Sequence, residues 1–313
     1  MSLSLKILGC SSATPTPDRY STAQVLNVLE RFFLIDCGEG AQINMRRYKI
    51  NMLRINHIFI SHVHGDHFLG LPGVLSSMNM QGRTSDLHIY SHEKLHTLIN
   101  AFIDTFDAPL GYNIIYHKLS GDNGLSLIYE DDKVTVHSFP LRHRIPTCGF
   151  LFREKPKLRH LNGEMAKELN IPIYKRINIK QGEDFTDADG IVHPNSELTT
   201  EPDHSCSYAF MSDTVKLTKA IHWIEGVDLL YHEATYGEDN KKRARDNHHS
   251  TAKQAAEIAK AANVGKLVIG HYSNRYKDLQ PLLDEARTVF AETYTAKDGA
   301  TFEVKDTAVE GGI

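Results

Sequence analysis

Short apolar stretches that alternate with polar positions recur along the chain, and they predict a protein rich in β-strands. The clearest alternation runs from 133 to 139, where Val134 and Val136 face one side while Thr135 and His137 face the other. Longer stretches with apolar residues three or four positions apart predict helices between the strands. The expected strands are 3–8, 24–29, 31–35, 58–60, 87–90, 113–119, 125–129, 133–139, 207–211, 227–231 and 266–269. The expected helices are 41–48, 69–80, 93–106, 251–262 and 279–294.

One segment, 153–200, interrupts this pattern. Its periodicity is weak, and three prolines break it up. Between 153 and 182 there are eight lysines and arginines but only three glutamates, a balance of 8 − 3 = +5. A charged run is often a solvated loop without a partner, but a long insertion inside a compact domain more often has a function. We therefore expect a single domain over residues 1–313 with a basic insertion at 153–200.

The composition is that of a soluble globular protein with room for a sizeable core, since 41% of the 313 residues are hydrophobic and 24% are charged. No apolar run approaches the ~20 residues of a membrane span. The chain starts directly in a strand pattern without a secretion signal. The four cysteines form no C-x-x-C pair, which favours reduced thiols in a cytoplasmic protein. The net charge of −4, taken alone, argues against a nucleic-acid partner, although the basic insertion departs from it.

The densest candidate chemistry follows the apolar run 58–60, where His62, His64, Asp66 and His67 fall within six residues. On an extended segment the first two histidines point to the same side, and a glycine-flanked turn brings the other two side chains round to face them. Imidazole nitrogen and carboxylate oxygen suit zinc. Four such ligands fit two adjacent ions better than one, an arrangement used mainly on phosphate esters. A chain with 18 histidines forms some clusters by chance, but H-x-H-x-D-H after a strand is much harder to obtain that way.

A two-metal site needs further ligands, and the ends of other strands should supply them. His143, Asp213 and His271 each follow an apolar β run at its carboxyl end. Any one of them could be an ordinary polar residue after a strand, but together they provide the three groups that are missing. Asp36 ends another strand and has two open interpretations, because it either orients a metal ligand or solvent or is a simple turn aspartate.

The motif H-x-H-x-D-H after a strand is the signature of the metallo-β-lactamase superfamily, which this chain resembles. The resemblance implies an α+β fold, a four-layered αβ/βα sandwich with metals at one edge of the paired sheets, here with a protruding basic arm. It also implies two zinc ions per chain, bridged by Asp213 and by a water or hydroxide. The implied ligands are His62, His64 and His143 for one ion and Asp66, His67 and His271 for the other.

Within that superfamily the chain resembles the ribonuclease Z family over almost its whole length. The matching segments include P-L-R-H at 140–143, H-E-A-T at 232–235, H-S-T at 249–251 and H-x-S-x-R-Y at 271–276. The resemblance implies a zinc-dependent endoribonuclease that cleaves the 3′ trailer from precursor tRNA through a metal-activated water and leaves a 3′-hydroxyl on the tRNA. It further implies that 153–200 is a tRNA-binding arm and that the protein is a homodimer.

This interpretation gives three residues catalytic roles. Asp66 would bind metal and accept a proton from the attacking water. His249, at the start of a predicted helix, would protonate the leaving 3′ oxygen. Glu233 would hold His249 in the right tautomer and raise its pKa. His248 is an immediate rival for the donor, and the match to H-S-T favours its neighbour.

Three other functions are consistent with parts of the sequence. Another phosphodiesterase of the same superfamily, acting on small cyclic or aryl phosphodiesters, would have the same metal site but would not need the basic insertion. A thioester or lactam hydrolase gains no support from the H-E-A-T and H-S-T elements. A non-catalytic RNA-binding module would not need seven candidate metal ligands. Cleavage of a precursor tRNA, compared with hydrolysis of a small phosphodiester, separates these functions.

Overall fold

The protein is described here by a computed structural model that covers residues 3–105, 109–120 and 124–304. The chain separates into two compact units. The main unit contains the residues up to Arg153 and Cys206–Val304, and the inserted unit is Glu154–Ser205. Each unit is built around apolar side chains of its own.

The first sheet of the main unit has seven strands in the order β18-β1-β2-β3-β4-β5-β6. Its strands are β1 (Leu3–Gly9), β2 (Ala23–Val28), β3 (Arg31–Cys37), β4 (Ile55–Phe59), β5 (Leu87–Ser91), β6 (Ile114–Lys118) and β18 (Thr301–Val304). The pairs from β3 to β6 are parallel, whereas β18, β1, β2 and β3 pair antiparallel. The parallel strands therefore end at one common edge of the sheet.

The second sheet also has seven strands, in the order β17-β16-β15-β14-β9-β8-β7. Its strands are β7 (Ser126–Glu130), β8 (Val134–Leu141), β9 (Thr147–Glu154), β14 (Ser207–Met211), β15 (Leu229–Glu233), β16 (Lys266–Gly270) and β17 (Thr293–Thr295). The strands from β14 to β17 are parallel, and β9 pairs antiparallel with β14. Residues after β14, β15 and β16 consequently leave the sheet at the same edge.

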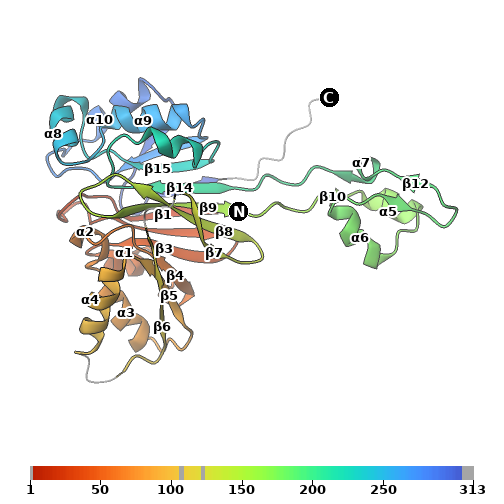
Figure 1. Ribbon diagram of the computed structural model, residues 1–313, viewed down its shortest axis with the longest axis horizontal. Coiled ribbons are helices and arrows are strands. Elements are labelled where there is room, and N and C mark those ends of the chain that lie inside the picture. Colours follow the sequence, from red (N-terminus) through yellow and green to blue (C-terminus); the bar gives the residue numbers. More distant parts are fainter. Residues whose placement is uncertain (1–2, 106–108, 121–123, 305–313) are drawn as a thin grey trace. The chain divides into compact units, whose positions relative to one another are not determined.

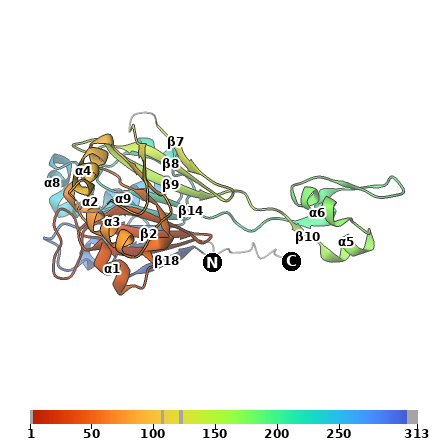
Figure 2. The same cartoon turned by 90° about the horizontal axis from the view of Figure 1, so that it is seen from below.

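Helices cover the outer face of each sheet, which gives the four layers of an αβ/βα sandwich (Figures 1 and 2). The helices are α1 (Ala41–Arg47), α2 (Gly65–Phe68), α3 (Leu71–Met80) and α4 (Glu93–Ile103) beside the first sheet, and α8 (Lys241–Asp246), α9 (Ala252–Ala261) and α10 (Gln280–Arg287) beside the second. Three short 3₁₀ helices are Met52–Arg54, Thr218–His222 and Glu238–Asn240. Between the sheets the ring of Phe59 lies 5.5 Å from that of Phe150 and 5.4 Å from that of Phe152. The expected α+β sandwich is therefore present.

One predicted element differs from the structure in its second half. The helix expected over 279–294 ends at Arg287, and residues 293–295 form β17. Thr293 pairs with Leu267 of β16. Pairing with a distant strand thus overrides the local helical pattern. The last residue of the helix expected over 93–106 lies outside the described residues.

The inserted unit is a small folded body rather than an irregular loop. Ala166, Ile171, Ile179, Phe185 and Leu198 are buried together at its centre. Its elements are β10 (His160–Leu161), α5 (Gly163–Glu168), α6 (Ile173–Lys180), β11 (Phe185–Thr186), β12 (Val192–His193), α7 (Asn195–Leu198) and β13 (Thr199–Thr200). Strand β10 pairs with β13 and β11 pairs with β12. These elements are too short for a clear periodic pattern, so the sequence did not reveal them.

The positive balance expected of the insertion holds only for its first part. Residues 154–182 carry seven cations and three acids, whereas 183–205 carry seven acids and no lysine or arginine, so the unit as a whole has 7 − 10 = −3. Three of the seven cations, Lys175, Arg176 and Lys180, lie on α6. The same helix exposes Ile173 and Tyr174. A basic and partly apolar helix, rather than the entire insertion, is therefore the feature that suits an RNA partner.

No helix within the described ranges is both long enough and apolar enough to cross a membrane. All four cysteines are buried, and none forms a disulfide within the described part of the chain. Burial raises the pKa of the Cys37 thiol. It is therefore protonated at neutral pH and a weak nucleophile.

Candidate metal centre

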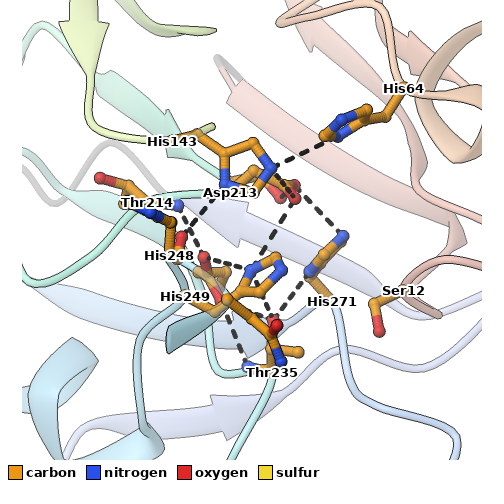
Figure 3. Close-up of polar contacts among 12 residues, drawn as sticks. Ser12, His64, His143, Asp213, Thr214, Thr235, His248, His249 and His271 are labelled. Carbon is orange, nitrogen blue, oxygen red and sulfur yellow. Dashed lines mark hydrogen bonds and ion pairs between the residues drawn. The ribbon is translucent and has the colours of Figure 1, made fainter. Parts of the chain in front are cut away.

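The main unit brings all seven predicted ligands together at one edge of the two sheets. Figure 3 shows four of them, His64, His143, Asp213 and His271. His62, His64, Asp66 and His67 follow β4, and the others follow β8, β14 and β16. Ligand atoms of His62, His64, His143 and Asp213 lie within 4.8 Å of one another, and so do those of Asp66, His67 and His271. The sequence-based grouping is thus compatible with the geometry, and Asp213 lies between the two groups.

In the first group three imidazoles converge beside Asp213. Nδ1 of His64 lies 2.9 Å from Nε2 of His62 and 3.3 Å from Nε2 of His143. Oδ1 of Asp213 lies 3.9 Å from Nε2 of His62 and 3.6 Å from Nε2 of His143. These closely spaced imidazole nitrogens are the atoms that would bind a single ion.

The second group lies on the other side of the same carboxylate. Oδ2 of Asp213 is 3.0 Å from Nε2 of His67 and 3.2 Å from Nε2 of His271. Oδ2 of Asp66 is 3.5 Å and 3.4 Å from the same two nitrogens. The two oxygens of Asp213 therefore face different groups, which is the geometry required of a bridging ligand.

The donor set fits a pair of metal ions. Nε2 of His67 and Nε2 of His271 are buried and make no hydrogen bond with a described residue, although each faces two carboxylates. A buried polar atom without a partner is costly and needs an explanation. Bound metal supplies one, because imidazole nitrogen and carboxylate oxygen are the usual zinc ligands of hydrolytic sites.

Hydrogen bonds to the far nitrogens fix the tautomers of three of these histidines. Nδ1 of His67 lies 2.6 Å from Oδ2 of Asp36, and Nδ1 of His143 lies 3.1 Å from the carbonyl oxygen of His248. Nδ1 of His271 lies 2.9 Å from the hydroxyl oxygen of Thr235. When each Nδ1 donates, Nε2 keeps its lone pair for a metal. Of the two interpretations open for Asp36, the structure favours orientation of a ligand.

Two further groups that hydrogen-bond to the candidate ligands were not predicted from the sequence. The hydroxyl of Thr235 lies 2.5 Å from Oε2 of Glu233, which links His271 to that carboxylate. The backbone N–H of Ala13 donates to Oδ2 of Asp66 at 2.7 Å. A threonine inside H-E-A-T offers a detectable signal, but a backbone N–H in a distant loop has no residue-specific signal.

Electrostatics favour neutral imidazoles in one group and a cation in the other. Burial lowers the pKa of His62 well below its usual value, with a further contribution from His67, and burial also lowers the pKa of His64 and of His143. Burial alone would lower the pKa of His67 too, but Asp66, Asp213 and Asp36 raise it well above its usual value. A positive charge is therefore strongly favoured among these carboxylates, whether a proton or a metal ion provides it.

His249 and Glu233 form a pair at the rim of the centre. Nδ1 of His249 lies 3.0 Å from Oε1 of Glu233 and 3.8 Å from Oδ1 of Asp213. Burial works against the charged imidazole, but the charge of Glu233 outweighs it and raises the pKa of His249 to about 9. His248 contributes its backbone carbonyl to His143. Of the two neighbouring histidines, only His249 has a ring that contacts the Glu233 carboxylate among the described contacts.

The backbone is held in an unusual conformation at several of these positions. The φ angles of Asp213 and His271 are both +57°, and those of Asp36 and His248 are +53° and +60°. The left-handed region costs a residue with a side chain of order 1–3 kcal/mol and persists only when the surrounding packing enforces it. Such strain concentrates where side chains must be aimed, as at these strand ends.

Comparisons with known proteins identify the family. Ribonuclease Z of Bacteroides thetaiotaomicron is 44% identical over 302 residues, which cover 96% of this chain and 95% of that protein. Ribonuclease Z of Phocaeicola vulgatus is 45% identical over 292 residues, covering 93% and 94% respectively. The chain belongs to the ribonuclease Z family.

Solved structures agree with this ribonuclease Z assignment at the level of the fold. The crystal structure of human tRNase Z, short form, has a TM-score of 0.71 and 24% identity, and the match covers 96% of this chain and 99% of that one. The metallo-β-lactamase fold protein YhfI from Bacillus subtilis has a TM-score of 0.68 and 17% identity, with coverage of 97% and 100%. A family model described as Anti-Pycsar protein Apyc1 matches residues 3–102. That stretch contains the H-x-H-x-D-H motif but less than half of the chain.

Proposed function

We propose that this protein is an endoribonuclease that removes the 3′ trailer from precursor tRNA and leaves a 3′-hydroxyl on the tRNA. Membership of the ribonuclease Z family, with about 45% identity over nearly the whole chain, is the observation that carries this proposal. The clustering of seven ligand-type side chains beside His249 and Glu233 supports a hydrolytic rather than a purely binding role.

The centre is proposed to hold two zinc ions. His62, His64 and His143 would bind one, Asp66, His67 and His271 the other, with Asp213 shared between them. When bound, the ions lower the pKa of a water and offset the charge that develops on the phosphoryl oxygens. Asp66 is oriented by the N–H of Ala13, so one of its oxygens is fixed among the ligands and the carboxylate is placed to accept a proton from that water.

The leaving oxygen needs a proton, and His249 is placed to supply it. Its Nδ1 faces Glu233, so Nε2, which forms no hydrogen bond with a described residue, carries the proton to be donated. The pKa of His249, raised to about 9, keeps the ring protonated at neutral pH. Glu233 is buried and also accepts hydrogen bonds from the N–H of Thr214 and the hydroxyl of Thr235. It is a positioning residue, since it acts through His249.

The inserted unit is proposed to bind the tRNA. Helix α6 combines Lys175, Arg176 and Lys180 with the exposed ring of Tyr174. Cations bind phosphates, and an exposed aromatic ring offers a stacking surface for a base. From the family relationship we further propose a homodimer that works in the cytoplasm.

One experiment tests this function against its main alternative, a phosphodiesterase for small substrates. The purified protein is incubated with a 3′-extended precursor tRNA, with and without a chelator, and in parallel with bis(p-nitrophenyl) phosphate. Specific cleavage after the last encoded tRNA nucleotide, abolished by the chelator, is the expected result. Turnover of the small diester without cleavage of the tRNA would favour the alternative.

Metal content gives the first prediction. We expect about two zinc ions per chain after purification, because a two-metal site requires both. Mass spectrometry under native conditions and elemental analysis measure the stoichiometry. His143→Ala should lower it toward one, whereas His160→Ala, in the inserted unit, should leave it unchanged. A metal-free protein with full activity would contradict the assignment.

Removal of the inserted unit gives the second prediction. Arg153 pairs with Ser207, so residues 155–205 can be replaced by a short turn between β9 and β14. The affinity for precursor tRNA should fall about 10–100-fold, as expected for one or two lost phosphate contacts at ~0.1 M salt. The rate of hydrolysis of the small diester measures the integrity of the centre.

A variant that removes positive charges from α6 tests whether these charges bind the tRNA. Lys175→Ala with Lys180→Ala removes two cations from α6, and Glu183→Gln with Asp189→Asn changes the acidic part of the same unit as a matched control. Only the first variant should weaken tRNA binding. Equal losses on tRNA and on the small diester after deletion would mean that the unit is structural.

A further inference from the structure

A second cavity lies directly beside the metal centre and shares one wall with it. Its volume is about 500 Å³. Among the described residues it is lined by Val215, Lys216, Lys241, Lys242, Arg245, His249 and Gln254. The neighbouring cavity over the centre is lined by Asp66, His143, Asp213 and His271, and also by His249. His249 therefore lines both cavities, one that contains the candidate ligands and one that contains the basic side chains.

The second cavity is strongly basic. Four of its lining residues are cations and none is an acid. Lys216 and Lys241 contact Glu257 and Glu238 at 2.7 and 2.9 Å, and these two acids lie outside the lining. Lys242 forms no ion pair with a described residue, and Arg245 is 3.7 Å from Asp246 at its nearest. Four cations around one cavity, of which Lys242 has no ion-pair partner among the described residues, form a positively charged surface that can bind phosphates.

We propose that this basic cavity binds the backbone phosphates on the 5′ side of the cleaved bond, that is, the end of the tRNA itself rather than the trailer. This inference rests on the proposed function, and it assigns a direction to the RNA in the site. Lys242 and Arg245 are the positioning residues, because Lys242 has no ion pair with a described residue and the ion pair of Arg245, at 3.7 Å, is longer than those of Lys216 and Lys241.

The chemistry of the cleavage sets this direction. Hydrolysis that leaves a 3′-hydroxyl breaks the bond between phosphorus and the 3′ oxygen, while a new bond forms between phosphorus and the water oxygen. The phosphate stays on the trailer, the water loses its proton to a base, and the 3′ oxygen takes up a proton. That oxygen belongs to the last tRNA nucleotide, so this nucleotide must lie next to the proton donor.

The position of His249 then places the rest of the strand. The nucleotide bonded to the leaving oxygen lies against His249, and the preceding phosphates continue past it, away from the candidate ligands. The basic cavity begins at this side chain. The trailer then continues within the cavity over the candidate ligands, which Ala13 and Asn274 also line. The cations of the basic cavity thus hold the last tRNA nucleotide, which carries the leaving 3′ oxygen, in position. They do not contact the trailer.

The test neutralises charges on both partners. Lys242→Ala with Arg245→Ala is assayed against precursor tRNAs that carry uncharged methylphosphonates at two linkages, either just 5′ or just 3′ of the cleavage site. On the unmodified RNA the variant should lose about 10- to 100-fold in kcat/KM at ~0.1 M salt, with a shallower salt dependence. On the 5′-neutralised RNA the variant and the wild type should differ by less than about threefold, whereas on the 3′-neutralised RNA the full difference should remain.

A matched control removes the same charge elsewhere. Lys260→Ala with Lys266→Ala changes two exposed lysines of the main unit that do not line the cavity. This control should cleave each RNA as the wild type does. If the difference between the variant and the wild type disappeared on the 3′-neutralised RNA instead, the direction of the RNA would be the reverse of the proposed one. If neither modification changed that difference, the cations would be only solvated. Failure of the wild type to cleave unmodified precursor tRNA would instead refute the proposed function, so the two failures are distinguishable.

Discussion

Replacing His249 by alanine is expected to slow the chemical step on precursor tRNA by roughly 10²–10⁴-fold, the usual range for loss of a general acid. The 3′ oxygen of a nucleotide is a poor leaving group without a proton. In the proposed mechanism His249 donates that proton, and Glu233 raises the pKa of His249 to about 9. Single-turnover kinetics at saturating enzyme measure the step directly, and metal analysis should show unchanged content.

The leaving group provides the control for this prediction. A nitrophenolate leaves readily as an anion, so the same variant should lose much less activity on bis(p-nitrophenyl) phosphate. Glu233→Ala should show the same selectivity in weaker form, since it removes the group that orients and charges His249. Activity of the wild type on tRNA should also fall as the pH rises through the pKa of the donor, because the acid must be protonated.

The neighbouring histidine supplies the decisive contrast. His248→Ala should have little effect, because the contact from this residue to the centre is made by its backbone carbonyl. A damaging His248→Ala combined with a silent His249→Ala would mean that the wrong histidine has been assigned. If both variants cleaved tRNA normally, the proton would have to come from solvent or from another group.

Replacing Asp66 by alanine is expected to have the other large effect, a loss of at least about 10³-fold on tRNA and on the small diester alike. The change removes a ligand and the proton acceptor together. Oδ2 of Asp66 lies 3.5 Å from His67 and 3.4 Å from His271, so its loss opens one whole side of the second ligand group. Zinc content should fall toward one ion per chain.

A conservative change separates charge from shape in this prediction. Asp66→Asn keeps an oxygen that can accept the hydrogen bond from Ala13 but carries no charge. It should be nearly as inactive as the alanine variant while retaining more structural order around the loop. An exposed aspartate elsewhere in the main unit, Asp104, serves as the control for substitution alone. Near wild-type cleavage by Asp66→Ala would show that this residue has been misassigned.

Residues that the fold brings together could be picked out from the sequence because the candidate site is assembled from strand ends. A strand is recognised from its own apolar pattern, and the polar residue that follows it is read directly from the chain. His143, Asp213 and His271 were found in this way before any spatial information was used. Parallel strands then bring their carboxyl ends to one edge, so local predictions suffice to bring distant residues together.

Features that depend on pairing between distant segments were not predicted. Thr293–Thr295 became a strand only through β16, and β18 exists only through its pairing with β1. Thr235 acts through a hydroxyl that links His271 to Glu233, a role that requires knowledge of three positions at once. The helices of the inserted unit were also missed, since each is too short to show more than about two turns of pattern.

The position of β18 has a consequence for synthesis on the ribosome. All candidate ligands have been translated by His271, yet the edge of β1 is paired only when Thr301–Val304 has been added. Asp298, made just before that strand, accepts hydrogen bonds from the N–H of Tyr20 and the thiol of Cys10, which flank the loop carrying Ala13. The loop that orients Asp66 is thus secured by some of the last described residues to be made. A nascent chain therefore contains all seven candidate ligands before Asp298, which secures the loop that orients Asp66, has been made.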